Sequence, residues 1–535
     1  MTTTDVCEAI VKPATLACKS SYCDLMVDQG HGSVGTAVVF ISHAWKYKFL
    51  DVVDALKSHF KATPDIIIWF DLFSNNQHKA VSLDFDWWCG VFMSAIADFR
   101  HVVMLLSPWG DPISLKRAWC LFEAYCSAKT KCKFEVALSG DEKQQFIEAV
   151  IADAEKHVNN MLSKIDCEQS ECYKPEDRDK IFDVVRREVS FGKINSMVFE
   201  QLRSWVLQVT SEELEVSKLL ACSGSSVSNS GGGGGGSVNS NVNKSSEFIR
   251  FLSLENALGD LYNLQGLYKE AESSYKHCLE ARTVTLGQED AATLQSLRNL
   301  SSIYKSQGKY TEAEILGKEC LEKSTLYLTE SHEDTLKSMS NLASVYLGQG
   351  KYDEAEPMYE KCLGMRIAKQ GEDHEDTLKA LNDLGTVYKS QGQYDKAEPL
   401  YKKCKGLCAT KLGEDHPDTL GSINNLAGLY ESQGRYDEAE PLYKDCLDKR
   451  IAKLGEDHPD TLISMNNLGS LYYNMNRYDE AESLFKKCLD MRTTKLGAGH
   501  PDTLGTVGWL VGIYSEQRKY DQVESLKKAY PAFKK

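Results

Sequence analysis

The sequence predicts two folds in one chain: a doubly wound α/β domain with a parallel sheet, followed by an all-α superhelix of repeated helical hairpins. Three observations predict this division. Short apolar runs alternate with helical spacing over residues 36–140, a strict 42-residue period governs residues 247–535, and glycine, serine and asparagine dominate residues 222–246 between them. Such a composition cannot form a core, so 222–246 is expected to be a flexible linker.

The front part contains four apolar runs suited to buried parallel strands. These runs are Thr36–Ser42, Asp65–Phe70, His101–Ser107 and Cys132–Leu138. Helical spacing is found between them, at Phe49–Phe60, Phe85–Phe99 and Leu115–Tyr125. Alternating strands and helices predict a sheet covered on both faces, with a ligand site at the carboxyl ends of the strands. Residues 1–35 are interpreted as a leader, and residues 141–221 as a helical extension.

The second part is built from a unit whose clearest copy is Thr419–Asp460. Each copy contains two apolar stripes at helical spacing. The dipeptide "QG" ends the first helix, and the turn "LGEDHPDT" closes the second helix and opens the next copy. Because one hairpin cannot bury its apolar faces alone, the copies are expected to stack. Seven copies are predicted over 247–535.

Composition limits the classes of partner. The net charge of −15 and the lack of a basic region argue against nucleic acid and anionic membranes, and no apolar run approaches the length of a bilayer span. The N-terminus lacks the apolar centre of a signal peptide, so a cytoplasmic location is predicted. Six cysteines follow the 42-residue period, which predicts small core residues and no metal site. They are Cys278, Cys320, Cys362, Cys404, Cys446 and Cys488.

The repeats resemble the tetratricopeptide repeats (TPR) of kinesin light chains. Phe251–Lys535 shares their 42-residue period and the pattern "NNLA…LY…QG.YDEAEPLY". This resemblance implies a right-handed superhelix whose first helices line a concave, peptide-binding surface. A kinesin light chain proper is disfavoured, because no sustained heptad pattern for a coiled coil precedes Phe251.

One repeat position carries a row of amides. Asparagine occupies it at Asn299, Asn341, Asn425 and Asn467, and Asp383 interrupts the row. Asparagine is a poor residue for a helix interior, so its recurrence needs a reason. Its amide can bracket a peptide backbone with a donor and an acceptor, or it can bond between neighbouring repeats. Both interpretations remain open, and Asp383 is expected to weaken the grip on an acidic ligand.

The front part resembles the Toll/interleukin-1 receptor (TIR) domain, which has a flavodoxin-like fold. "FISHAW", "WFDLFSNNQ" and "AIADFRHVVMLLSPWGDPISLKRAWCLFEAY" carry the resemblance, over about residues 36–140. Enzymatic TIR domains hold a catalytic glutamate in a Trp-Cys-x-x-Glu pattern, which Trp119–Glu123 reproduces. The resemblance therefore implies that Glu123 is the catalytic acid of an NAD⁺-cleaving site, with NAD⁺ as substrate and no further cofactor.

Other polar and aromatic residues are expected to line the nucleotide pocket: Ser42, Trp45, Asp71, Ser107 and Trp119. Most of them follow the predicted strands, where local hydrogen bonding is the alternative role. A single carboxylate is chemically sufficient for this reaction. Nicotinamide leaves as a neutral molecule without a proton donor, and the carboxylate stabilises the positive charge that develops on the ribose.

Two functional hypotheses follow. In the first, an intracellular signalling or receptor-type protein binds a peptide or protein ligand on its superhelix, and its TIR-like domain self-associates and cleaves NAD⁺ on clustering. The enzyme is then an NAD⁺ glycohydrolase that releases nicotinamide. In the alternative, the chain is a non-enzymatic scaffold or adaptor with a TIR-like self-association module and a cargo-binding repeat array.

Overall fold

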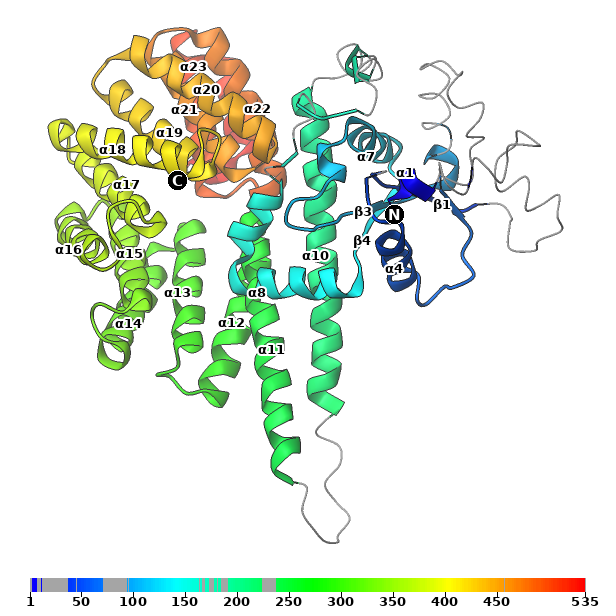
Figure 1. Cartoon of the computed structure of the whole chain (residues 1–535). Coiled ribbons are helices and arrows are strands. Elements are labelled where there is room, and N and C mark those ends of the chain that lie inside the picture. Colours follow the sequence, from blue (N-terminus) through cyan, green and yellow to red (C-terminus); the bar gives the residue numbers. More distant parts are fainter. Residues whose placement is uncertain are drawn as a thin grey trace. The chain divides into compact units, whose positions relative to one another are not determined.

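The computed structural model describes residues 2–6, 11, 37–44, 46–70, 94, 96–162, 164–165, 169–172, 178–179, 181–183, 191–223, 237–456 and 458–534. The chain divides into two units (Figure 1). The first comprises Met1–Val209 with Ala452–Glu456, and the second comprises Thr210–Ile451 with Asp457–Lys535.

The first unit contains a four-stranded parallel sheet. Its strands are β1 (Val39–Ser42), β2 (Ile68–Trp69), β3 (His101–Leu105) and β4 (Lys133–Ala137), in the spatial order β2-β1-β3-β4. Phe40 pairs with Trp69 on one side and with Val102 on the other. The parallel sheet predicted from the four apolar runs is therefore confirmed, although β2 is shorter than its run.

Helices accompany the strands. The helices and helical turns of this unit are α1 (Thr3–Val6), α4 (Phe49–His59), η3 (Ser114–Lys116), α7 (Ala118–Thr130), α8 (Gly140–Leu162) and α10 (Phe191–Ser223), which continues into the second unit. Only residues 94 and 96–99 of the helix predicted at 85–99 are described.

The strand order places α4 and α7 on opposite faces of the sheet. The chain moves from β1 to β2 in one direction and from β3 to β4 in the other, and both crossovers are right-handed by rule. Figure 1 shows the two helices on either side of the strands. Val39, Ile41 and Val103 pack with Val52 of α4, so the alternate residues of these strands face α7.

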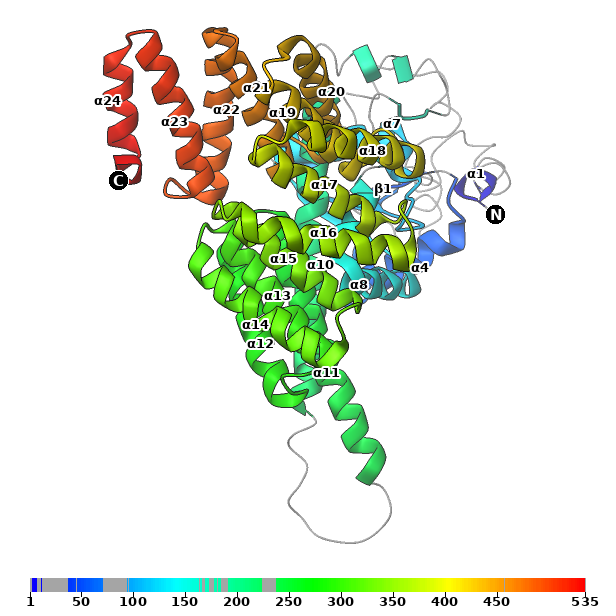
Figure 2. The ribbon, with the colours of Figure 1, turned by 90° about the vertical axis from the view of Figure 1, so that its left-hand side faces the viewer.

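The second unit is entirely helical, as predicted for the superhelix. Its described helices pair into seven hairpins that follow one another in Figure 2. The helices are α11 (Ser237–Leu264), α12 (Tyr268–Thr285), α13 (Ala291–Ser306), α14 (Tyr310–Leu328), α15 (Glu333–Gly348), α16 (Tyr352–Gln370), α17 (Glu375–Ser390), α18 (Tyr394–Leu412), α19 (Pro417–Ser432), α20 (Tyr436–Leu454), α21 (Pro459–Asn474), α22 (Tyr478–Leu496), α23 (Pro501–Glu516) and α24 (Tyr520–Ala529), with η4 (Pro531–Lys534) at the end.

The linker prediction differs from the structure at both ends. Helix α10 runs to Ser223, and α11 begins at Ser237, ten residues before the predicted first repeat. The N-terminal part of α11 continues the helix that packs in the first hairpin, because adding residues to an existing helix is easier than starting a new one. Residues 224–236 lie outside the described part.

The repeated turns explain where each helix begins and ends. His416 caps α19: its Nδ1 accepts a hydrogen bond from the Asp418 N–H at 3.2 Å, with Pro417 at the first helical position. Gly434 follows the first helix with a φ of 73°, and Gly413 follows the previous second helix with a φ of 99°. The second hairpin has Thr329 at the latter position, with a φ of 96°.

Neighbouring hairpins are joined by buried polar contacts. Arg450 is 5% exposed, and its Nη1 donates to the Asp460 carbonyl at 2.8 Å and to the Ser464 Oγ at 2.7 Å. The periodic cysteines are buried, and the Sγ of Cys446 donates to the Leu420 carbonyl at 3.2 Å. Their predicted role as core residues is confirmed.

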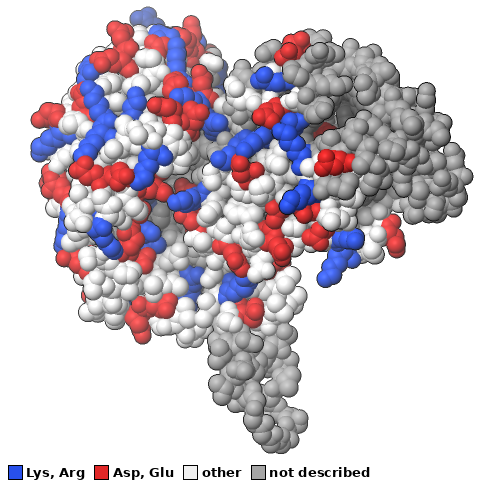
Figure 3. Space-filling model, in the orientation of Figure 1, with Lys and Arg blue, Asp and Glu red and all other residues white. Residues whose placement is uncertain are grey.

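A ladder of ion pairs runs along the outer edge of the repeats. A glutamate early in most of the second helices pairs with a cation in the turn of the next hairpin, whereas Glu356 of α16 accepts from Gln391. The pairs include Glu272–Lys309, Glu314–Lys351, Glu398–Arg435, Glu440–Arg477 and Glu482–Lys519, at N···O distances of 2.7 to 3.1 Å. Accordingly, Figure 3 shows both signs of charge interspersed over the visible face of the repeats, without a basic patch.

Candidate functional site

Glu123, predicted as a catalytic acid, lies on α7 and is 7% exposed. The preceding turn of α7 holds Cys120, whose Sγ lies 3.5 Å from the His43 carbonyl just past β1. Trp119 is half-buried and meets Phe122 edge-on. The first turn of α7 therefore lies beside the carboxyl end of β1, and Glu123, one turn after Cys120, is shielded from water.

Ser42 lies at the same end of the sheet. It alternates with Ile41, which packs on the α4 side, so Ser42 faces α7. Its hydroxyl is buried and makes no hydrogen bond among the described residues. Ser42, Trp119 and Glu123 are therefore on one side of the sheet. Trp45 and Asp71 lie outside the described residues.

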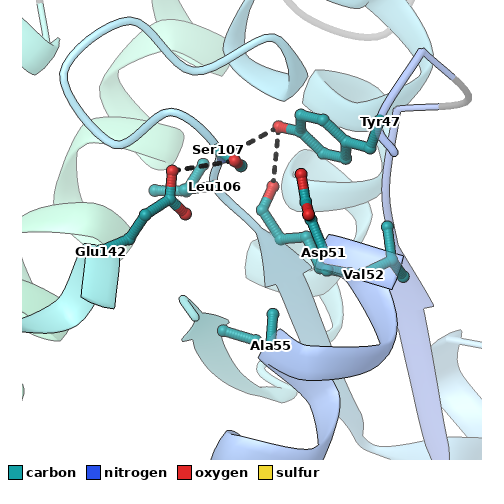
Figure 4. Close-up of a pocket in the computed structure, with 9 residues that line it drawn as sticks. Tyr47, Asp51, Val52, Ala55, Leu106, Ser107 and Glu142 are labelled. Carbon is teal, nitrogen blue, oxygen red and sulfur yellow. Dashed lines mark hydrogen bonds between the residues drawn. The ribbon is translucent and has the colours of Figure 1, made fainter. Parts of the chain in front are cut away.

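Ser107 lies on the side of the sheet that α4 covers, away from Ser42. It borders a small cavity on the α4 side, together with Tyr47, Asp51 and Glu142 (Figure 4). The Ser107 Oγ donates to the Glu142 Oε1 at 2.9 Å. Burial raises the pKa of Glu142, and nearby Asp51 adds to that effect. Ser107 and its cavity thus lie on the α4 side of the sheet, whereas Glu123 belongs to α7 on the other side.

Tyr47 is the residue that organises this second cavity, and sequence reasoning missed it. Its hydroxyl donates to the Leu105 carbonyl at 3.2 Å and accepts from the N–H groups of Ser107 and Ser114. Burial raises the pKa of Tyr47 to about 12, so the hydroxyl keeps its proton. No local pattern marks Tyr47, because its partners are about 60 residues away in sequence.

In the repeats, the first helices of successive hairpins contact one another along the row α13, α15, α17, α19, α21 and α23. The predicted amide row lies on these helices and divides into two halves. Asn299 donates to Asp260 at 3.2 Å, and Asn341 accepts from the Ser301 Oγ at 3.0 Å. These two asparagines bond between neighbouring repeats.

The later half of the row is different. Asn425 and Asn467 are half-buried, and their amides make no hydrogen bond among the described residues. Asp383, which interrupts the row, is likewise half-buried without a hydrogen-bonding partner in the described part. Burial raises the pKa of Asp383 to about 6, and the opposing effect of Lys305 is smaller.

Two lysines at equivalent positions flank this row, and they were not predicted. Lys305 donates to the Ser344 Oγ of the next hairpin at 3.1 Å. Lys389 faces Gly428 instead, and its Nζ lies 2.7 Å from where a Cβ on Gly428 would stand. Within the described residues the Lys389 ammonium has no hydrogen bond or ion pair, and burial lowers its pKa.

The last hairpin ends the row with an aromatic residue. Trp509 occupies the asparagine position, stacks on Phe485 at a centroid distance of 5.7 Å and meets Tyr473 edge-on at 5.4 Å. Its place 42 residues after Asn467 was visible in the sequence. The row therefore runs from bonded amides, through Asp383 and two unbonded amides, to an aromatic cluster.

Comparison with known families identifies the hairpins. A family model described as tetratricopeptide repeat matches residues 250–325, 334–410, 379–450 and 418–494. The second unit thus contains tetratricopeptide repeats over most of residues 250–494, as the sequence pattern predicts. Repeats of this class mediate contacts with other proteins. No curated protein sequence matches the chain.

Several solved structures resemble parts of the chain. TPR-like repeats assigned to a kinesin light chain of Podosopora anserina are 25% identical, covering 38% of this chain and 95% of theirs, with a TM-score of 0.31. BtubC (BKLC) from P. vanneervenii is 20% identical over 44% of this chain and 92% of its own, with a TM-score of 0.32. A Rap protein complexed with competence and sporulation factor is 12% identical over 74% and 96%, with a TM-score of 0.44.

Among the described residues, no group of three or more histidine, cysteine, aspartate or glutamate side chains is placed to hold a metal ion. In the same part of the chain, no helix combines the length and the apolar character that a bilayer crossing requires.

Proposed function

We propose that the chain is a scaffold or adaptor whose repeats bind an extended segment of a partner protein along the first helices. The observation that carries this proposal is the pair of half-buried amides of Asn425 and Asn467, which make no hydrogen bond within the described part of the chain. An amide offers one donor group and one acceptor, as a peptide group does. Two such residues on neighbouring first helices, about 10 Å apart, can therefore hold peptide groups about three residues apart in an extended ligand.

The surroundings favour a particular ligand composition. Lys389 offers an ammonium group with unused donors to a carbonyl or carboxylate of the ligand. The Trp509 cluster supplies apolar and aromatic area at the far end of the row. Asp383 repels acidic side chains at neutral pH, so an acidic group of the ligand is expected to lie nearer to Lys389 than to Asp383.

The test is a panning experiment with a random peptide library displayed on phage, using the full chain as bait. Asn425→Ala and Asn467→Ala are each expected to weaken the selected peptide about fivefold, near 1 kcal/mol, without lowering the melting temperature. Asn341→Ala is the matched control: it removes one of the two acceptors of the Ser301 hydroxyl, a contact between repeats, and is expected to lower stability. Unchanged affinity in both ligand-side variants would assign the whole row to packing.

We also propose a second activity, cleavage of NAD⁺ by the first unit on self-association. The burial of Glu123 next to Trp119 supports it, because a carboxylate acts most strongly on a developing cation where water is excluded. The bond between nicotinamide and ribose would break, nicotinamide would leave with the bonding electrons as a neutral molecule, and water would add to the ribose carbon and release a proton. The β2-β1-β3-β4 order also fits the flavodoxin-like topology that the TIR resemblance implies.

Nicotinamide release from NAD⁺ tests this activity, with the purified chain crowded in solution or tethered on beads. Wild-type protein is expected to release nicotinamide, and Glu123→Gln is expected to abolish release at an unchanged melting temperature. Glu142→Gln is the matched control, since Glu142 lies on the opposite side of the sheet, and it should retain release. Absence of release from crowded wild-type protein would leave the scaffold function alone.

A further inference from the structure

His500 joins the last hairpin to the first two. It precedes α23, yet its Nε2 lies 3.0 Å from the carbonyl oxygen of Ser306 at the end of α13. Its ring also packs on Tyr268, the first residue of α12, at a centroid distance of 5.6 Å. These residues are separated by about 200 positions in the chain and belong to the same unit.

The hydrogen bonds fix the chemistry of this contact. The Nδ1 of His500 accepts from the Asp502 N–H at 3.2 Å, which caps α23. A carbonyl oxygen can only accept, so the Nε2 must carry the proton that it donates to Ser306. Ser306 ends α13, where the helix leaves carbonyl groups without partners. One imidazole therefore satisfies an amide of one helix and a terminal carbonyl of another.

The repeats supply an internal comparison. His332, His374, His416 and His458 hold the same capping position and accept the same backbone hydrogen bond. His332, His374 and His416 have side chains 37 to 44% exposed, whereas the side chains of His458 and His500 are 6% and 8% exposed. Capping alone therefore does not bury a histidine at this position, and His500 is buried where its ring contacts Tyr268 and Ser306 of the first two hairpins.

The surface that His500 contacts is formed by the start of α12 and the end of α13, and a hydrogen bond holds these two parts together. The Gln307 Nε2 donates to the Tyr268 carbonyl at 3.1 Å, which holds the end of α13 against the start of α12. Tyr268 lies close enough to Asp502 and Asp460 for both to influence its ionisation, and burial with these charges raises the pKa of Tyr268 to about 12. Residues of the sixth and seventh hairpins thus surround a tyrosine of the first.

We propose that His500 is a reversible latch that closes the superhelix after one turn of seven hairpins, by joining α23 to the Tyr268–Ser306 corner. Closure fixes the spacing of the first helices along the inner face. The latch consists of one hydrogen bond and one ring contact, so it can open without unfolding any hairpin. It acts whether or not the repeats bind a peptide.

The test compares His500→Asn with His416→Asn in the full chain without ligand. Asparagine is itself a good helix cap, so both variants keep the cap, and only the first loses the reach to Ser306. Small-angle X-ray scattering is expected to show a larger radius of gyration for His500→Asn alone. Hydrogen exchange of residues 303–309 is expected to become about tenfold faster in that variant, with residues 429–435 unchanged as an internal reference.

A second variant changes Tyr268, the ring partner of His500. Tyr268→Leu is expected to open the superhelix as His500→Asn does, whereas Tyr520→Leu, at the equivalent and 64% exposed position of the last hairpin, is expected to change nothing. Far-ultraviolet circular dichroism confirms that the hairpins remain folded. Dimensions and exchange equal to wild type in both latch variants would overturn the proposal.

Discussion

Replacing Asp383 with asparagine is expected to stabilise the repeats at pH 7.5 by roughly 1–3 kcal/mol. The pKa of this carboxyl is raised from 3.8 to about 6 by burial. At about 1.4 kcal/mol for each pH unit, ionising it in the folded protein costs up to about 3 kcal/mol. The expected gain can be smaller than about 3 kcal/mol for two reasons. Asp383 is only half-buried, so water lowers the cost of its charge, and the substitution removes a negative charge that stabilises the Lys305 ammonium. Asparagine already occupies this position in four other hairpins.

The sign of the pH dependence follows from the raised pKa. Below pH 3.8 the carboxyl is protonated in both folded and unfolded states, so it imposes no penalty. The penalty grows as the pH rises from 3.8 and is complete above about 6. Chemical unfolding at pH 7.5 and pH 5 should therefore show about half the gain at the lower pH. Asp490→Asn, at an exposed position of α22, is the control, and an equal gain at both pH values would contradict the prediction.

The fold was predictable where local patterns repeat. The 42-residue period gave the hairpins, and the turn "LGEDHPDT" located the helix starts because its histidine, proline and aspartate act on adjacent backbone groups. The contact of His500 with Ser306 was not predictable, since the same histidine recurs in other repeats without it. Lys389 was missed for a related reason. Among the described residues its ammonium has no hydrogen bond because Gly428 of the next hairpin stands where Ser344 bonds the equivalent Lys305.

The arrangement of the candidate site in the first unit could be predicted only in part, for a different reason. All strand ends were expected to contribute to one pocket, but side chains alternate between the two faces of a sheet. Ser42 pairs in register with Met104, so Ser107, three residues later, lies on the other side. Strand register is a property of paired strands, and a single sequence does not specify it. The burial of Glu123 was consistent with its position on the apolar helix that begins at Ala118.

Thr329→Gly is expected to stabilise the chain by roughly 1–2 kcal/mol, although glycine substitutions usually destabilise. Thr329 has φ 96° and ψ 156°, nearly the values of Gly413 two hairpins later, φ 99° and ψ 159°. This region is essentially restricted to glycine, and a β-branched residue there costs about 1–3 kcal/mol. The greater freedom of glycine in the unfolded chain offsets about 0.5–1 kcal/mol of the gain.

The turn itself explains why threonine adopts this conformation. The Thr335 Oγ donates to the Thr329 carbonyl at 2.7 Å, as Thr419 donates to the Gly413 carbonyl at 2.8 Å. Stacking of the hairpins thus imposes the glycine geometry on whichever residue is present. Chemical unfolding checks the prediction, with Thr410→Gly in α18 as the control, because glycine inside a helix is less favourable than threonine by a few tenths of a kcal/mol. A loss of stability in Thr329→Gly would show that the backbone of this turn relaxes around threonine.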